Sequence, residues 1–120
     1  PDLIVMVLSA TAQEAAARAL GCTYAGEIFA DRAYTDDATL VDRSLPGAVI
    51  HDPELAGARM VEMVKAGAII TGSGKRIDAA IDTICLHGDT PTAVQIAQSV
   101  RTALEAADVT VTQFDGRTGT

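Results

Sequence analysis

Residues 3–30 read LIVMVLSATAQEAAARALGCTYAGEIFA, and this stretch decides the fold of the chain. The continuous apolar run Leu3–Leu8 is typical of a strand covered on both faces. Good helix formers follow over Ala12–Leu20, and Gly21 ends that helix where left-handed backbone costs least. A second short strand is expected at about Ala25–Ala30. The stretch therefore predicts strand, helix and strand in succession, which is the repeating unit of a parallel sheet.

Two later helix starts combine a capping side chain with a proline. Asp52-Pro53 and Thr90-Pro91 each place an acceptor oxygen before a proline, which suits the first helical position because no N–H is needed there. Gly67 is expected to end the first of these helices. Ser9 or Thr11 can cap the N-terminal helix, since a hydroxyl oxygen accepts an orphan backbone N–H.

The remaining segments complete an alternating order in one unit, residues 1–120. The expected order is strand, helix, strand, long loop, helix, hairpin, strand, helix and strand, with a mainly parallel sheet. The later strands are expected at 68–71 and 75–78, as a hairpin around Gly72-Ser73-Gly74, at 83–86 and at 109–111. Residues 113–120 are polar and rich in Gly and Thr, so a loose tail is expected there.

Composition excludes several classes of function. The formal net charge is −7 and the pI is about 4.5, whereas nucleic-acid binding and docking on anionic membranes need clustered Lys and Arg. Cys22 and Cys85 form no CxxC pair, so a structural zinc site is not expected and free buried thiols are favoured over a disulfide. The apolar runs are far shorter than the roughly 20 residues of a membrane span, and a cytoplasmic location is the default expectation.

Two polar clusters each follow a predicted strand. The first spans Glu27–Tyr34, with Arg43 further along the long loop 31–45, and the second is His87-Gly88-Asp89-Thr90-Pro91. Because ligand sites form at the carboxyl ends of parallel strands, both clusters are expected on the same edge of the sheet. Loops as long as 31–45 are usually functional or disordered.

His87 and Asp89 are the candidates for acid–base chemistry. Histidine supplies a base near neutral pH, and a carboxylate two residues on can orient it or bind a cation. The alternative is local: Asp89 caps the following helix and His87 makes a nearby hydrogen bond. Cys85 shares a strand face with His87, so a Cys–His nucleophile pair is conceivable, although a buried thiol is favoured because reactive cysteines need an electropositive setting.

The arginines of the first cluster are candidates for binding an anion. Arg32 and Arg43 can form a fork for a carboxylate or phosphate, which suits guanidinium geometry. Alternatively, Asp31 and Arg32 form an ordinary surface ion pair. Tyr34 is the aromatic residue favoured for a binding role, in a chain with few aromatic side chains. Lys75 follows Gly74, but the segment lacks the spacing of a phosphate loop and predicts a hairpin turn.

Three motifs resemble one family. They are EIFADRAY at 27–34, RSLPGAVI at 43–50 and ICLHGDTP at 84–91, and their order and spacing resemble the LamB/YcsF lactam-utilisation family over about residues 3–111. The family forms the A subunit of the bacterial ATP-dependent 5-oxoprolinase. Leu86 and Asp42 stand where Val and Pro are common in the family, and neither change touches the motif side chains.

The resemblance implies a fold and a reaction. The fold implied is the C-terminal half of a distorted β/α barrel, similar to the glycoside hydrolase/deacetylase superfamily. The reaction implied is ATP-driven hydrolysis of the lactam of 5-oxo-L-proline to L-glutamate, with Mg²⁺ accompanying ATP and no tightly bound metal. The implied partners are a 5-oxoproline-type small molecule, subunits B and C, and the missing N-terminal half or a second copy, because the N-terminal motifs of the family are absent here.

The resulting hypothesis assigns roles to six residues. His87 and Asp89 are the expected catalytic pair, and Arg32 and Arg43 are expected to hold a carboxylate or phosphate. Asp31 and Tyr34 are expected to shape the pocket. Two alternatives remain open: a metal-dependent hydrolase or deacetylase, argued from the fold analogy, and a non-catalytic half-barrel module that docks with another protein chain of the enzyme.

Overall fold

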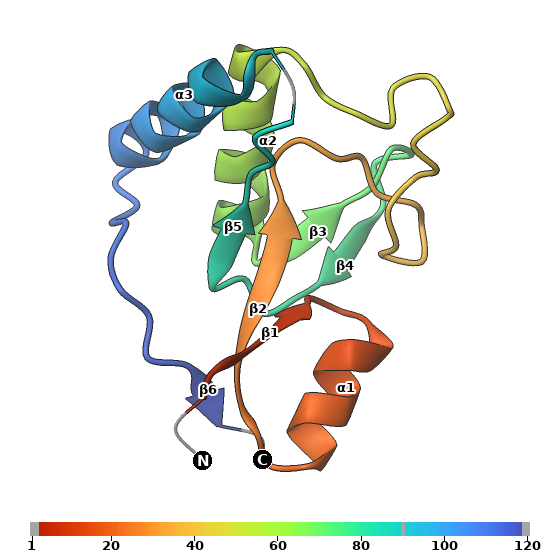
Figure 1. Cartoon of the computed structure of the whole chain (residues 1–120), viewed down its shortest axis with the longest axis vertical. Coiled ribbons are helices and arrows are strands. Elements are labelled where there is room, and N and C mark those ends of the chain that lie inside the picture. The colour runs from red at the N-terminus through yellow and green to blue at the C-terminus, as the bar shows by residue number, and fades with distance from the viewer. Residues whose placement is uncertain (1–2, 90, 119–120) are drawn as a thin grey trace.

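The computed structural model describes residues 3–89 and 91–118, and its strands and helices alternate as the sequence predicts (Figure 1). The elements, in chain order, are β1 (Val5–Leu8), α1 (Ala12–Ala19), β2 (Thr23–Phe29), α2 (Pro53–Ala66), β3 (Ala68–Ile70), β4 (Arg76–Asp78), β5 (Thr83–Cys85), α3 (Ala93–Ala106) and β6 (Arg117–Thr118). Within this part of the chain, no helix is both long and apolar enough to cross a membrane.

The main sheet is largely parallel, which confirms the predicted class. Its strands lie in the order β1-β2-β5, with β1 and β5 both parallel to β2. The registers pair Leu8 with Glu27 and Phe29 with Cys85, so the end of β2 lies beside the ends of both neighbours. β3 and β4 form the separate antiparallel hairpin that the sequence predicts.

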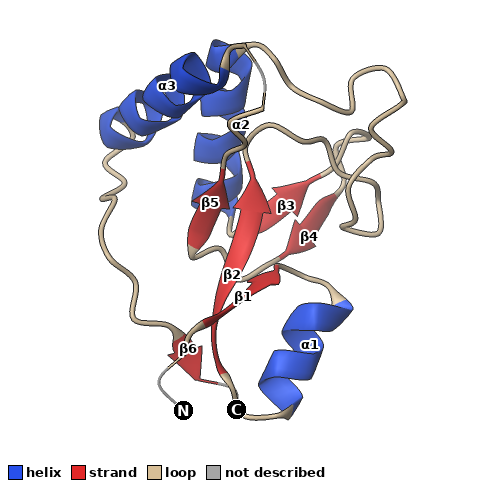
Figure 2. Ribbon diagram, viewed as in Figure 1, coloured by secondary structure: helices blue, strands red, loops and turns tan. Residues whose placement is uncertain are grey.

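One face of the main sheet carries the core. Ile28 is fully buried and packs in one cluster with Met60 and Met63 of α2 and Ile96 of α3, while Ile84 joins that cluster from β5. Because side chains alternate along a strand, the neighbouring residues of β2 and β5 point to the other face. The residues that α2, α3 and the β3–β4 hairpin contribute to this cluster bury that face, and Figure 2 shows where these elements lie around the sheet.

The prediction that the first strand is covered on both faces is wrong for the described part of the chain. Val5 and Met6 are 43% and 62% exposed, whereas Val7 is buried against Ala17 of α1 and Tyr24 of β2. The difference arises because β1 is an edge strand with α1 on one side only. An uncovered apolar edge strand is a surface that pairs readily with further chain.

The predicted helix ends are confirmed at α2. Asp52 accepts a hydrogen bond from the backbone N–H of Glu54 at 3.0 Å, and Gly67 ends the helix with a φ of 63°. At α1 the predicted hydroxyl cap is wrong, because Thr11 Oγ1 donates to the carbonyl of Leu8. The side chains of the first helical turn instead accept from the segment that leads into the helix: Glu14 accepts from Ala10 N and Gln13 from Leu8 N.

The C-terminal strand lies later than predicted. Residues 109–111 form no strand, and Arg117–Thr118 pair antiparallel with the start of β2, so part of the expected loose tail is ordered. The reason is an ion pair: the Arg117 guanidinium lies 2.7 Å from Asp82 Oδ1, and the Asp82 side chain is 2% exposed. Thr90, the predicted cap of the last helix, lies outside the described residues, and α3 begins after Thr92.

Candidate active site

The long loop 31–45 is folded back on itself and tied to the hairpin. Isolated bridges pair Arg32 with Val49 and Tyr34 with Leu40. Asp36 accepts hydrogen bonds from the Thr71 and Ser73 hydroxyls at 2.6 and 2.7 Å, and these bonds lower the pKa of Asp36. A carboxylate therefore sits at the glycine-rich turn, which agrees with the hairpin interpretation and opposes binding of a phosphate there.

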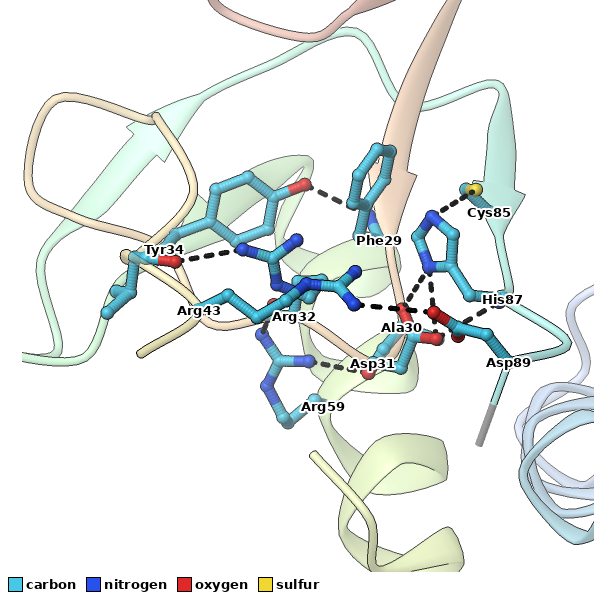
Figure 3. A network of polar contacts seen from close by, with 11 residues as sticks. Phe29, Ala30, Asp31, Arg32, Tyr34, Arg43, Arg59, Cys85, His87 and Asp89 are labelled. Atoms are coloured by element: carbon cyan, nitrogen blue, oxygen red, sulfur yellow. Dashed lines mark hydrogen bonds and ion pairs between the residues drawn. The ribbon is translucent and has the colours of Figure 1, made fainter. Parts of the chain in front are cut away.

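The first cluster and the second meet at one pair of side chains, Asp31 and His87 (Figure 3). His87 Nδ1 lies 2.9 Å from Asp31 Oδ1 and 3.1 Å from Oδ2, and the His87 backbone N–H donates to Oδ2 at 3.0 Å. The Asp31 side chain is 3% exposed, whereas that of His87 is 32% exposed. Because a carboxylate accepts hydrogen bonds, this contact favours the tautomer of His87 with the proton on Nδ1 and a lone pair on Nε2.

The other side of the His87 ring faces Cys85 and Phe29. Cys85 Sγ lies 3.6 Å from Nε2, and the Phe29 ring packs edge-on at a centroid distance of 5.1 Å. Three contacts from the ends of β2 and β5 therefore fix the ring: the carboxylate at Nδ1, the sulfur at Nε2 and the aromatic edge. Figure 3 shows the imidazole held between Asp31 and Cys85.

The groups around His87 are predominantly acidic. Burial raises the pKa of Glu27, and the nearby His87 opposes that rise. Burial raises the pKa of the Cys85 thiol, and the charges of Glu27 and Asp31 raise it further. The sulfur is therefore a protonated thiol at neutral pH, and both predicted thiols, Cys22 and Cys85, are free and half-buried.

Asp89 lies apart from the His87 ring contacts. It pairs with Arg43 at 3.3 Å, where both side chains are 56% exposed, and the Arg43 hydrogen bond lowers the pKa of Asp89. Asp89 therefore neither orients the imidazole nor caps α3, whose N-cap Thr92 makes no side-chain cap bond. Asp31 occupies the orienting position that the sequence pattern predicted for Asp89.

Arg32 and Arg43 both lie near Asp31 and Asp89, but they make different contacts (Figure 3). Arg32 Nη2 donates to the Val41 carbonyl at 2.9 Å, and its Nε is buried with no hydrogen-bond partner among the described residues. The alternative interpretation, a surface ion pair between Asp31 and Arg32, is not among the contacts of the described residues, and Asp31 is turned toward His87. Arg43 is the exposed cation of the site.

Tyr34 and Arg59 hold the end of β2 in place. Tyr34 is 4% exposed, and its hydroxyl accepts from the Phe29 N–H at 2.9 Å. Arg59 of α2 donates to the carbonyls of Ala30 and Arg32 at 2.7 and 3.0 Å, and burial lowers its pKa. Arg59 was not among the residues predicted from the sequence. An arginine next to Met60, within the apolar stripe of α2, is the signal that could have indicated a partly buried cation.

No group of three or more His, Cys, Asp or Glu side chains in the described residues could hold a metal ion. The arrangement instead offers a base at Nε2, a thiol beside it and an exposed guanidinium at the rim. Such a set suits the transfer of a proton next to an anionic substrate.

Comparisons with known proteins point to one family. The sequence matches the LamB/YcsF family over residues 1–119. It is 69% identical over 115 residues to the A subunit of 5-oxoprolinase from Ruegeria pomeroyi, covering 96% of this chain and 46% of that protein. The corresponding protein of Rhodopseudomonas palustris strain BisB18 is 52% identical over 115 residues, covering 96% of this chain and 45% of its own length.

A solved structure is similar over the same share of the chain. The lactam utilization protein from Thermus thermophilus superposes with a TM-score of 0.83 at 39% identity, covering 95% of this chain and 45% of that one. The chain thus spans about half the length of the relatives that it matches.

Proposed function

The chain belongs to the LamB/YcsF family, and on that premise we propose that it forms part of an ATP-dependent 5-oxoprolinase, which hydrolyses the lactam of 5-oxo-L-proline to L-glutamate. The relatives named as the A subunit of 5-oxoprolinase and the similar lactam utilization protein support this proposal. The single observation that carries it within the chain is the Asp31–His87 pair, a buried carboxylate holding a half-exposed imidazole.

ATP has a clear chemical purpose in this reaction. A lactam carbonyl is a poor electrophile, and phosphorylation of its oxygen creates a leaving group that water can displace. The described residues contain no group of three or more His, Cys, Asp or Glu side chains that could hold a metal ion, and no step is assigned to the Mg²⁺ that accompanies ATP. The chain's own contribution is to hold the substrate and to move protons.

His87 is proposed as the base. Asp31 keeps the proton on Nδ1, so Nε2 can take a proton from an attacking nucleophile while Asp31 stabilises the imidazolium that forms. A positioned base of this kind contributes roughly 10²–10⁴ in rate. Its half-exposed side chain leaves Nε2 within reach of a substrate.

Arg43 is proposed to bind the carboxylate or the transferred phosphate of the substrate. Its present partner, Asp89, is held at 3.3 Å in an exposed pair, which a substrate anion can replace at little cost. Arg32, with its unpartnered Nε, is proposed to support the same anion. Asp89 is then proposed to neutralise Arg43 while no substrate anion is bound. Asp31 and Tyr34 are proposed to shape the site.

The partners are proposed from the exposed sheet. β1 and β5 are both edge strands of the described sheet, and Leu3 to Met6 are exposed apolar residues. We propose that the remaining length of the protein, or a second copy, covers this surface to complete a β/α barrel in the cytoplasm, and that subunits B and C complete the enzyme.

The test is substitution of His87 in the complete protein, reconstituted with its partner subunits. His87→Ala is expected to lower ATP-dependent release of glutamate from 5-oxoproline by about 10²-fold or more. His51→Ala is the matched control, because His51 is exposed and its backbone carbonyl alone takes part in the contact with Thr92. Activity of His87→Ala close to that of the control would overturn the role of His87.

A further inference from the structure

The roles proposed above leave out Cys85, whose sulfur lies against Nε2 of His87. We propose that Cys85 is the nucleophile of the site, whose sulfur forms a covalent bond to the lactam carbonyl carbon, with His87 as the base and Asp31 as the positioning residue. This inference rests on the proposed function and adds a covalent intermediate to it.

The geometry is that of a nucleophile, a base and an orienting acid in a row. Cys85 Sγ lies 3.6 Å from His87 Nε2, and His87 Nδ1 lies 2.9 Å from Asp31 Oδ1 (Figure 3). This order of atoms is the general signature of an activated nucleophile, and apo contacts of this kind are often loose. The three residues come from the ends of β2 and β5, which the register of the parallel sheet places side by side.

The local backbone explains why these side chains meet. Cys85 ends β5 and His87 follows two residues later, so alternation directs both side chains to the same face. Phe29 is the direct partner of Cys85 in the register, and its ring packs edge-on against the imidazole. Asp31 follows two residues after Phe29 and completes the row.

The surrounding charges decide how the proton moves. Burial and the carboxylates of Glu27 and Asp31 raise the pKa of Cys85, so the resting sulfur keeps its proton and donates it toward Nε2. The same carboxylates favour a positive charge on His87 once the proton has moved. Attack therefore requires general-base transfer from sulfur to Nε2, as for a hydroxyl nucleophile, rather than a preformed thiolate.

The chemical steps balance with ATP and two water molecules. ATP transfers a phosphoryl group to the lactam oxygen, giving ADP. The sulfur then bonds to the carbonyl carbon, its proton passes to Nε2, and the carbon–oxygen bond breaks to release inorganic phosphate and leave a cyclic thioimidate. One water adds to the carbon–nitrogen double bond, and the ring carbon–nitrogen bond breaks to give a thioester and a free amine. A second water cleaves the thioester, which releases glutamate and returns the proton to sulfur.

The second thiol of the chain provides an internal control. Cys22 is also free and half-buried, but it packs beside the α1 cluster of Val7, Ala17 and Tyr24, away from His87. Loss of a half-buried thiol as such is therefore tested by Cys22→Ala. Serine at position 85 retains a hydrogen-bond donor for Nε2 but lacks the sulfur, so it tests whether the thiol itself is needed.

The experiment uses the complete protein reconstituted with its partner subunits. The substrates are ATP and 5-oxoproline labelled at the lactam carbonyl carbon. We expect Cys85→Ala and Cys85→Ser to lose about 10²-fold or more in glutamate release, with Cys22→Ala unchanged. In rapidly quenched wild-type enzyme, a hydroxylamine-sensitive label is expected on the peptide that contains residue 85, and on no peptide of Cys85→Ala.

Two results would overturn the nucleophile. One is a Cys85→Ala enzyme that works within about threefold of wild type, and the other is an unlabelled residue 85 in an active, quenched wild-type enzyme. Failure of the proposed function looks different, because wild-type enzyme would then release no glutamate from 5-oxoproline with ATP.

Discussion

Two acid–base contacts join the loop region after β2 to the segment after β5, and burial separates their roles. Asp31 meets His87 with a carboxylate that is 3% exposed, whereas Asp89 meets Arg43 in a pair whose side chains are both 56% exposed. The buried carboxylate also accepts the backbone N–H of His87, so its geometry is fixed from two directions. The exposed pair has one contact at 3.3 Å and is open to exchange with a ligand.

This difference divides the site into a fixed part and an exchangeable part. A group that moves protons must be held in one orientation before the substrate arrives, because misplacement of such a group is costly in rate. A group that binds a substrate anion must instead be able to release its resting partner. Asp31 and His87 meet the first requirement, and Arg43 with Asp89 meets the second.

The largest effect is expected from changing the buried contact. Asp31→Asn in the complete enzyme keeps the size of the side chain but places an NH₂ group against N–H donors, which turns or displaces the imidazole. We expect kcat for glutamate release to fall by about 10²–10⁴. The measurement is steady-state kinetics with the reconstituted enzyme.

Asp37→Asn is the matched control for that substitution. Asp37 lies in the same loop and is exposed, and its backbone N–H rather than its carboxylate makes the contact with Thr35. Equal kcat values for Asp31→Asn and Asp37→Asn would contradict the claim that the buried carboxylate of Asp31 orients His87 for catalysis.

A smaller effect, on KM rather than kcat, is expected at the exposed contact. Arg43→Ala removes the cation proposed for the substrate anion, and KM for 5-oxoproline or ATP is expected to rise by about tenfold, which corresponds to about 1.4 kcal/mol. Asp89→Asn frees Arg43 from its competitor, so KM is expected to stay level or fall while kcat stays within about twofold of wild type.

The same pair of variants can contradict the division. If Asp89→Asn lowers kcat as strongly as Asp31→Asn does, Asp89 belongs to the proton-moving part of the site, as its position in the HGD sequence suggested. Steady-state kinetics of the two variants side by side decides this.

Local patterns predicted most of the fold, because each depends on residues close in the chain. The Asp52-Pro53 helix start and the Gly67 helix end each depend on residues within one turn, and the structure keeps both. The exceptions depend on distant partners. The exposure of β1 depends on which distant elements pack against it. β6 forms where Arg117 pairs with Asp82, 35 residues away in the chain.

In the site, too, the local patterns were predicted and the contacts between distant residues were not. The two clusters were predicted to share one edge of the sheet, and the parallel register of β2 and β5 brings them together. Sequence spacing favoured Asp89 as the partner of His87, but the fold supplies Asp31 from 56 residues away. The contact of Arg59 with the end of β2 depends on helix packing, which no local pattern contains.

The measurement that tests the central claim most directly is the tautomer of His87, read by ¹⁵N NMR of the imidazole in the complete, ¹⁵N-histidine-labelled protein above the titration range of histidine. His51→Ala removes the signal of the other histidine in the 120-residue sequence and aids assignment. We predict a proton on Nδ1, an unprotonated Nε2, and loss of that preference in Asp31→Asn. A proton on Nε2 in the wild-type protein would contradict the assignment of His87 as the base that Asp31 orients.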